Sequence, residues 1–413
     1  MLDKGKNTMN KVELLAPAGN FSKLKTAIYY GADAVYVGGK SFSLRALSDN
    51  FTDDELTQAV KYVHERGKKI YVTVNIFARN ADFEKAKNYF VFLQNIGVDA
   101  AIVSDTGLIY VARQVAPNLK IHLSTQANTT NKYTAKFWQE YGLDRVILAR
   151  ELSLKEISEI SSFNEGLEIE AFIHGAMCIS YSGRCLMSNY FTGRDSNRGE
   201  CVQACRWEYS IREKSKDGDF YDVQEDGRGT YIMNSKDLNM IDYIAEFIKA
   251  GVCSFKIEGR MKSEYYLATV INAYRRAIDD YYKIGEKYKE NPLYNAELCK
   301  TAHRAFTTAY MLGDNKQTVN YDNSQSKGDS TFIALVLGYD KENKTALVEM
   351  RNRFKEGDVL EVLSPSKQFN EKITVGEMYD EKGERVSDAK IVQQKLRLKT
   401  DIILNEGDIL RSV

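Results

Sequence analysis

The sequence predicts an α/β protein: a (β/α)8 TIM-like barrel with a Cys-rich insertion and a small C-terminal antiparallel β-barrel. Three observations predict it. From Val12 onward, short apolar runs alternate with longer amphipathic stretches, the pattern of parallel βα units. Eight such runs are present, and the last part of the chain changes to short strands of alternating polarity. The 413 residues are enough for a barrel of about 250 residues with further modules.

The eight predicted strands follow one another at regular intervals. Thr52 is the expected N-cap of the helix after the second strand, and Gly67 is the expected stop. An open doubly wound sheet is the alternative, but no GxGxxG follows the first strand, so the barrel is favoured. The predicted strands are 12–19, 32–39, 68–75, 99–105, 120–126, 145–150, 168–175 and 254–260.

Three regions are expected along the chain. The barrel covers 1–313, and an insertion at about 176–230 separates its last two strands. Because barrel active sites lie at the carboxyl ends of the strands, the insertion should emerge on the catalytic face. The polar, aperiodic segment 314–330 is a predicted linker. The region 331–413 is the predicted β-barrel, either a stabilising appendage or a substrate-docking module; the phrases FKEGDVLEVL and LNEGDILRSV each place Gly-Asp before a strand.

Charge and hydropathy restrict the class of partner. Lys plus Arg and Asp plus Glu both total 57, so a nucleic-acid partner would need a local basic patch rather than a basic protein. The first residues hold no apolar signal segment, and no later apolar run approaches a membrane span of about 18 residues. We therefore expect a cytoplasmic protein that does not enter the membrane.

The insertion holds four of the chain's six cysteines, spaced C-x6-C-x15-C-x3-C. In a reducing compartment, clustered cysteines are more often metal ligands or redox groups than disulfides. The spacing lacks the paired C-x2-C knuckles usual for structural zinc, whereas four thiolates can hold a 4Fe-4S cluster. Chemistry alone leaves an iron–sulfur cluster, zinc and unligated thiols open. The four residues are Cys178, Cys185, Cys201 and Cys205.

The stretch EAFIHGAMCISYSGRCLMS resembles a signature of the collagenase-like peptidases of unknown catalytic type. That signature runs Glu-x-Phe-x-x-Gly-small-Met-Cys and then Gly-x-Cys, and every fixed position is present. The resemblance extends through ELLAPAG, GADAVYVGG, FTGRDSNRGECVQACRW, FKIEGRMKS and HRAFTTAYMLG, and so covers nearly the whole chain.

Despite the family name, the resemblance implies an RNA-modifying enzyme. Similar members are associated with prephenate-dependent, oxygen-independent hydroxylation, and those most similar in the GRDSNRGECVQACRW block install the 5-hydroxyl of the tRNA wobble uridine. The resemblance implies a 4Fe-4S cluster held by the four clustered cysteines, with prephenate as co-substrate and tRNA as partner. It also leaves open a homo- or hetero-oligomer with a related family member.

Candidate residues for chemistry and substrate binding lie at predicted strand ends. His174, four residues before Cys178, is a candidate acid, base or supporting residue, whereas His122 is expected to be a core histidine. Prephenate is a dicarboxylate, so basic residues at strand ends are candidate ligands for it. An internal Lys-Glu-Arg network is the alternative role for the eighth-strand residues. The catalytic candidates are His174, Lys256 and Glu258, and the substrate-binding candidates are Arg45, Arg150 and Arg260.

Arginines and aromatic residues crowd the insertion, a combination that holds phosphates and stacks bases in single-stranded RNA. Alternatively, they wrap the cysteines and form local ion pairs. The predicted RNA-binding residues are Arg194, Arg198 and Arg206.

Two rival functions are retained. The first is a peptidase, as the family name implies, although the chain has neither a Gly-x-Ser-x-Gly elbow nor His-Glu-x-x-His. The second is a zinc-stabilised, noncatalytic RNA-binding protein.

Overall fold

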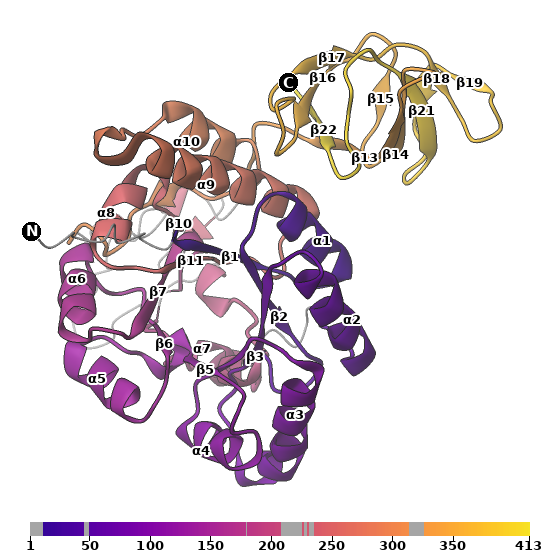
Figure 1. Ribbon diagram of the computed structural model, residues 1–413. Helices are drawn as coiled ribbons and strands as arrows, with labels where there is room; N and C mark the ends of the chain where they lie inside the picture. The colour runs from indigo at the N-terminus through magenta and orange to yellow at the C-terminus, as the bar shows by residue number, and fades with distance from the viewer. Residues whose placement is uncertain are drawn as a thin grey trace, which may run out of the picture.

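A closed parallel barrel forms the body of the protein (Figure 1). The computed structural model describes residues 11–44, 49–178, 180–207, 225–226, 229–230, 235–313 and 326–413. The eighth barrel strand pairs in parallel with both the first and the seventh, which closes the barrel and confirms the predicted fold. The barrel strands are β1 (Glu13–Pro17), β2 (Ala34–Gly38), β3 (Lys69–Val74), β4 (Ala100–Val103), β5 (Ile121–Leu123), β6 (Arg145–Ile147), β7 (Glu168–Ala176) and β11 (Ser254–Ile257).

Helices cover the outside of the barrel and bury their apolar faces against it (Figure 1). Several begin at side-chain caps; Thr52 forms the predicted cap as part of a capping box with Glu55. The following helix ends at His64, before the predicted stop at Gly67. The helices are α1 (Phe21–Tyr29), α2 (Asp53–His64), α3 (Phe83–Ile96), α4 (Thr106–Val115), α5 (Lys132–Glu140), α6 (Leu154–Phe163), α8 (Ile244–Lys249), α9 (Glu264–Ile284) and α10 (Pro292–Cys299).

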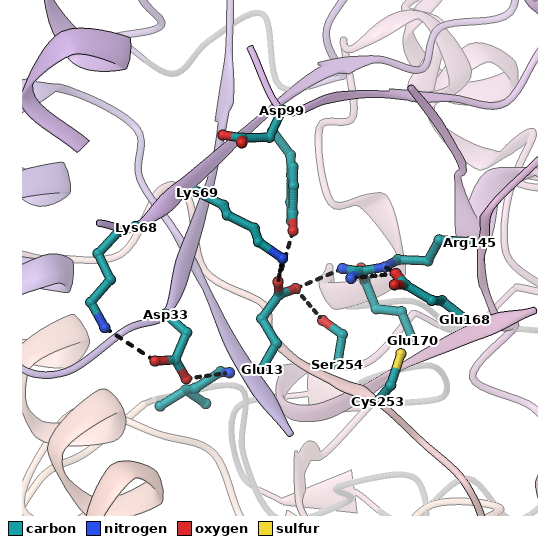
Figure 2. Close-up of polar contacts among 12 residues, drawn as sticks. Glu13, Asp33, Lys68, Lys69, Asp99, Arg145, Glu168, Glu170, Cys253 and Ser254 are labelled. Carbon is teal, nitrogen blue, oxygen red and sulfur yellow. Dashed lines mark hydrogen bonds and ion pairs between the residues drawn. The ribbon is translucent and has the colours of Figure 1, made fainter. Parts of the chain in front are cut away.

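Charged residues, rather than apolar ones alone, fill part of the barrel interior (Figure 2). The Arg145 guanidinium lies 2.6 Å from a Glu13 carboxylate oxygen and 3.1 Å from one of Glu170. The other Glu170 oxygen lies 2.6 Å from the Lys256 ammonium. Each charge is paired, as burial requires. The network therefore links β1, β6, β7 and β11 across the barrel.

The insertion after β7 folds over one end of the barrel in short elements. After the insertion comes β10, a strand that the sequence did not predict; it pairs antiparallel with β7, and β12, farther along the chain, pairs in parallel with β10. The described elements of the insertion are α7 (Met187–Thr192), β8 (Glu225–Asp226) and β9 (Gly229–Thr230), with 3-10 turns η3 (Ser196–Arg198) and η4 (Ala204–Arg206); β10 (Asp237–Asn239) and β12 (Phe306–Thr307) lie outside it.

The C-terminal region forms an antiparallel half-barrel with its own hydrophobic core. Gly357 and Gly407 adopt positive φ angles of 87° and 95° in the predicted Gly-Asp turns, a conformation that favours glycine. Much of the predicted linker, 314–325, lies outside the described residues. The strands are β13 (Phe332–Asp340), β14 (Thr345–Met350), β15 (Phe354–Lys355), β16 (Val359–Leu363), β17 (Lys372–Thr374), β18 (Met378–Tyr379), β19 (Arg385–Val386), β20 (Asp388–Ala389), β21 (Lys395–Lys399) and β22 (Ile409–Ser412).

The described residues include no helix that is both long and apolar enough to cross a membrane.

Candidate active site at the carboxyl ends of the barrel strands

A cavity of about 180 Å³ lies at the carboxyl ends of the barrel strands, beneath the insertion. Its walls include residues that directly follow strands: Asn75 after β3, Ser124 after β5 and Glu258 after β11. This is the end of a (β/α)8 barrel at which catalytic groups gather. The cavity is therefore the candidate active site.

All four clustered cysteines line this cavity. Cys178 is exposed and the other three are half-buried, and none forms a disulfide. Burial raises the pKa of the Cys205 thiol above its ordinary value, and the negative charge of Cys178 raises it further. Within the described part of the chain, no three His, Cys, Asp or Glu side chains lie in an arrangement that could hold a metal ion. The four thiols therefore line one cavity, but they are not close enough together to form a metal-binding arrangement in this structure.

Gly183 positions the cysteine loop against the barrel. It lies between Cys178 and Cys185 and has a φ angle of 76°. A Cβ atom there would lie 2.3 Å from the Gln126 carbonyl oxygen, so only glycine fits this contact without a shift.

Basic side chains from two strands also face the cavity. Arg150 lies beyond the end of β6; its guanidinium donates to the Ala176 carbonyl at 2.7 Å and lies over the Phe172 ring. Arg260 lies beyond β11, which ends at Ile257 rather than at the predicted 260, and donates to Ser43 and Thr73 hydroxyls. Both line the cavity, as do Lys256 and Glu258. Arg45 lies outside the described residues.

Lys256 is a buried cation of this wall. Only 4% of its surface is exposed, and its ammonium also lies 4.4 Å from the centre of the Tyr36 ring. Burial lowers the pKa of Lys256 below its ordinary value, while the neighbouring Glu170 carboxylate opposes that shift. Glu170 thus holds Lys256 in place from within the barrel.

Glu170 is a supporting residue that the sequence analysis does not single out among its candidates. The signal was the alternation of Glu168 and Glu170 along the seventh strand, which places both carboxylates on one side of it.

His174 lies away from the cavity. Its ring is buried and is surrounded by Tyr266 and Tyr274 of α9 and Phe306 of β12. Burial lowers the pKa of His174 to about 3, so the ring is neutral. It does not line the cavity that contains the cysteines. His122 is buried in the barrel core beside Tyr71.

The three predicted RNA-binding arginines have different surroundings. Arg198 donates to the Asp82 carboxylate at 2.9 Å and to the Phe77 carbonyl, so it fastens the insertion to the segment between β3 and α3. Arg206 donates to the side chain of Gln203. Arg194 and Arg206 line a second hollow, outside the main cavity.

Comparison with known proteins agrees with this architecture. The model of peptidase family U32 matches residues 19–321, and the model of the family's C-terminal domain matches residues 329–411. The chain belongs to peptidase family U32. The resemblance that the cysteine signature indicated is thereby confirmed.

Several curated proteins that are similar to this chain carry names from RNA modification. The tRNA hydroxylation protein P1 of Bacillus subtilis is 41% identical over 411 residues, covering 97% of this chain and 94% of its own. The tRNA hydroxylation protein P of Escherichia coli is 40% identical and covers 91% of each chain. The 23S rRNA 5-hydroxycytidine C2501 synthase of Escherichia coli is 37% identical over 65% of this chain and 40% of its own.

Proposed function

We propose that this protein is a tRNA hydroxylase, which adds a 5-hydroxyl group to the wobble uridine in a reaction that depends on prephenate and needs no oxygen. The observation that carries the proposal is its 41% identity to a tRNA hydroxylation protein over 97% of the chain. The similarity to an rRNA hydroxycytidine synthase supports the broader class, hydroxylation of RNA bases.

We further propose that Cys178, Cys185, Cys201 and Cys205 hold a 4Fe-4S cluster. In support, the chain offers four thiol donors around one cavity, and four thiolates suit such a cluster. When bound, the cluster would supply one-electron redox chemistry beside the reacting base. Gly183 lets the loop that bears two of these thiols lie directly on the barrel.

The basic wall of the cavity is proposed to bind the two carboxylates of prephenate. Arg150 offers a planar guanidinium, which suits carboxylates, and its contacts among the described residues are to a carbonyl and a ring rather than to an acid. Lys256 presents a second positive charge, held in place by Glu170. Glu258 lies on the same wall and is a candidate to accept or donate a proton near the base.

Nucleoside analysis tests the function directly. A strain that lacks this gene is grown without oxygen, and its total tRNA nucleosides are measured by mass spectrometry with and without the restored gene. We expect 5-hydroxyuridine derivatives to disappear and to return with the gene. An unchanged level would refute the tRNA assignment.

Metal analysis separates the proposal from the zinc-stabilised alternative. We expect protein purified without oxygen to contain iron and sulfide, and Cys→Ser substitution at each of the four positions to remove them. One zinc per chain and no iron would support the noncatalytic RNA-binding protein instead.

The peptidase alternative is tested on the same iron-loaded protein. Among the described residues, no hydrogen bond joins any of the four cavity thiols to a histidine, as a thiol nucleophile with its base would require. We therefore expect no cleavage of denatured collagen. Cleavage that follows the purified protein would favour the peptidase.

A further inference from the structure

A second hollow, of about 470 Å³, lies on the insertion beside the cysteine cavity. The residues that give it chemical character are two arginines, a tryptophan, a methionine and a glutamine from two parts of the chain. They are Arg194, Gln203, Arg206, Trp207 and Met261.

The hollow adjoins the candidate active site. Cys201 lines both it and the main cavity, while Gln203 and Arg206 line both it and a third hollow that also contains Cys178 and Cys205. The hollow and the cavity are therefore adjacent, as sites for neighbouring units of one chain-like ligand must be.

Aromatic rings are exposed at the hollow. Trp207 is 42% exposed and its ring centre lies 6.2 Å from that of Phe191, which in turn lies 5.2 Å from that of Tyr190. Tyr190 is 83% exposed and Met261 50%. A cluster of large apolar side chains at the surface of a protein often marks a binding site.

The charge of the hollow is positive. Among the described residues, neither Arg194 nor Arg206 forms an ion pair with a carboxylate; Arg206 instead donates to the amide oxygen of Gln203. Gln203 has a φ angle of 58°, a strained conformation for a residue with a side chain, and strain of this kind concentrates at functional sites. Gln203 lies between Cys201 and Cys205 in the chain, and its side chain accepts a hydrogen bond from Arg206.

We infer that this hollow is a nucleotide subsite, which stacks the base next to the one in the cavity on Trp207 and binds its phosphate through Arg194 and Arg206. Exposed rings combined with arginines are the features that bind single-stranded RNA. The inference rests on the proposed function, because it assumes that the cavity receives an RNA base.

Tryptophan fluorescence offers a direct test, since the chain has only two tryptophans and Trp138 is 8% exposed on α5. In full-length Trp138→Phe protein, the emission comes from Trp207 alone. We expect pentauridylate to quench this emission in a saturable manner and added salt to weaken the effect.

Variants then assign the contacts. Arg194→Gln and Arg206→Gln should each weaken the binding and lower the slope of log affinity against log salt by about 0.7. Lys61→Gln, on the exposed face of α2, is the matched control and should change neither. For tRNA binding, Trp207→Ala should cost roughly 5- to 100-fold in affinity, whereas Trp207→Phe should retain most of it.

The outcomes separate the inference from the proposed function. Absence of quenching in a protein that still hydroxylates tRNA would overturn the subsite. Quenching in the two arginine variants as strong as in the parent protein would overturn it as well. Saturable, arginine-dependent quenching in a protein that leaves tRNA unmodified would retain the subsite and reject the proposed function. Iron content, measured on every variant, confirms that the insertion is intact.

Discussion

At the scale of single residues, burial determines what His174 can do. The aromatic rings around it exclude water, so the neutral form is stabilised and the pKa falls to about 3. The neutral His174 ring does not line the cavity; it packs between α9 and β12. We therefore expect His174 to contribute to the stability of the fold rather than to catalysis.

The pH dependence of stability should reveal His174. Because its folded-state pKa is lower than the ordinary 6.5, the unfolded chain takes up a proton as the pH falls through 6.5, and stability decreases down to about pH 3. Between pH 7 and pH 5 this contributes about 2 kcal/mol. His174→Phe should lose that part of the pH dependence in urea unfolding. If the free energy of unfolding depended on pH in the same way in both proteins, the lowered pKa of His174 would be contradicted.

Glu170 and Glu168 offer a matched pair, because both contact Arg145. The Glu170 side chain is fully buried and also pairs with Lys256, whereas that of Glu168 is 50% exposed. Glu170→Gln leaves two buried cations without its charge and should cost about 3–5 kcal/mol in the free energy of unfolding. Glu168→Gln should cost less than about 1 kcal/mol. If the two variants lost the same free energy of unfolding in urea, burial of Glu170 would not explain its contribution to stability.

At the scale of elements, the insertion depends on a few contacts to stay on the barrel. Phe77 donates its backbone N–H to the Asn197 carbonyl at 3.0 Å, and Arg198 reaches both the Phe77 carbonyl and Asp82. These contacts join η3 to the segment that precedes α3. Because Cys201 lies only three residues after Arg198, these contacts also influence the position of its thiol.

If Arg198 holds the insertion on the barrel and does not bind RNA, removal of its partner Asp82 should also loosen the insertion. We expect both Arg198→Ala and Asp82→Ala to raise hydrogen exchange in 180–207, Arg198→Ala the more because it also loses the Phe77 contact, and the double variant to be little worse than Arg198→Ala. Deuterium uptake by mass spectrometry measures this. Weaker tRNA binding in Arg198→Ala, with no change in Asp82→Ala, would instead identify a phosphate contact.

At the scale of the whole molecule, one buried cation joins the C-terminal domain to the barrel. Arg411 on β22 is fully buried and donates to Glu297 of α10 and to Glu361 of β16, each at 2.7 Å. Burial alone would raise the pKa of Glu297, but Arg411 and neighbouring donors bring it below its ordinary value. Arg411 therefore pairs with one carboxylate of its own domain and one of the barrel domain.

Arg411→Met should weaken the coupling between the two domains. The buried carboxylates would lose their main partner, at a cost of about 3–5 kcal/mol, and we expect one thermal transition to become two in calorimetry. Arg385→Met, which breaks only an exposed pair with Glu356, serves as the control and should leave the transition unchanged. A single unshifted transition in Arg411→Met would contradict the coupling.

The sequence by itself determined the periodic features of this protein. The eight barrel strands, the cap at Thr52, the Gly-Asp turns and the clustered cysteines depend on neighbours in the chain, so their patterns are visible without a structure. The tertiary structure decided which side chains meet. It placed His174 among rings of α9, paired Lys256 with Glu170, fastened Arg198 to Asp82 and added β10 to the edge of β7. Those partners lie far apart in the chain, and only closure of the barrel and docking of the insertion bring them together.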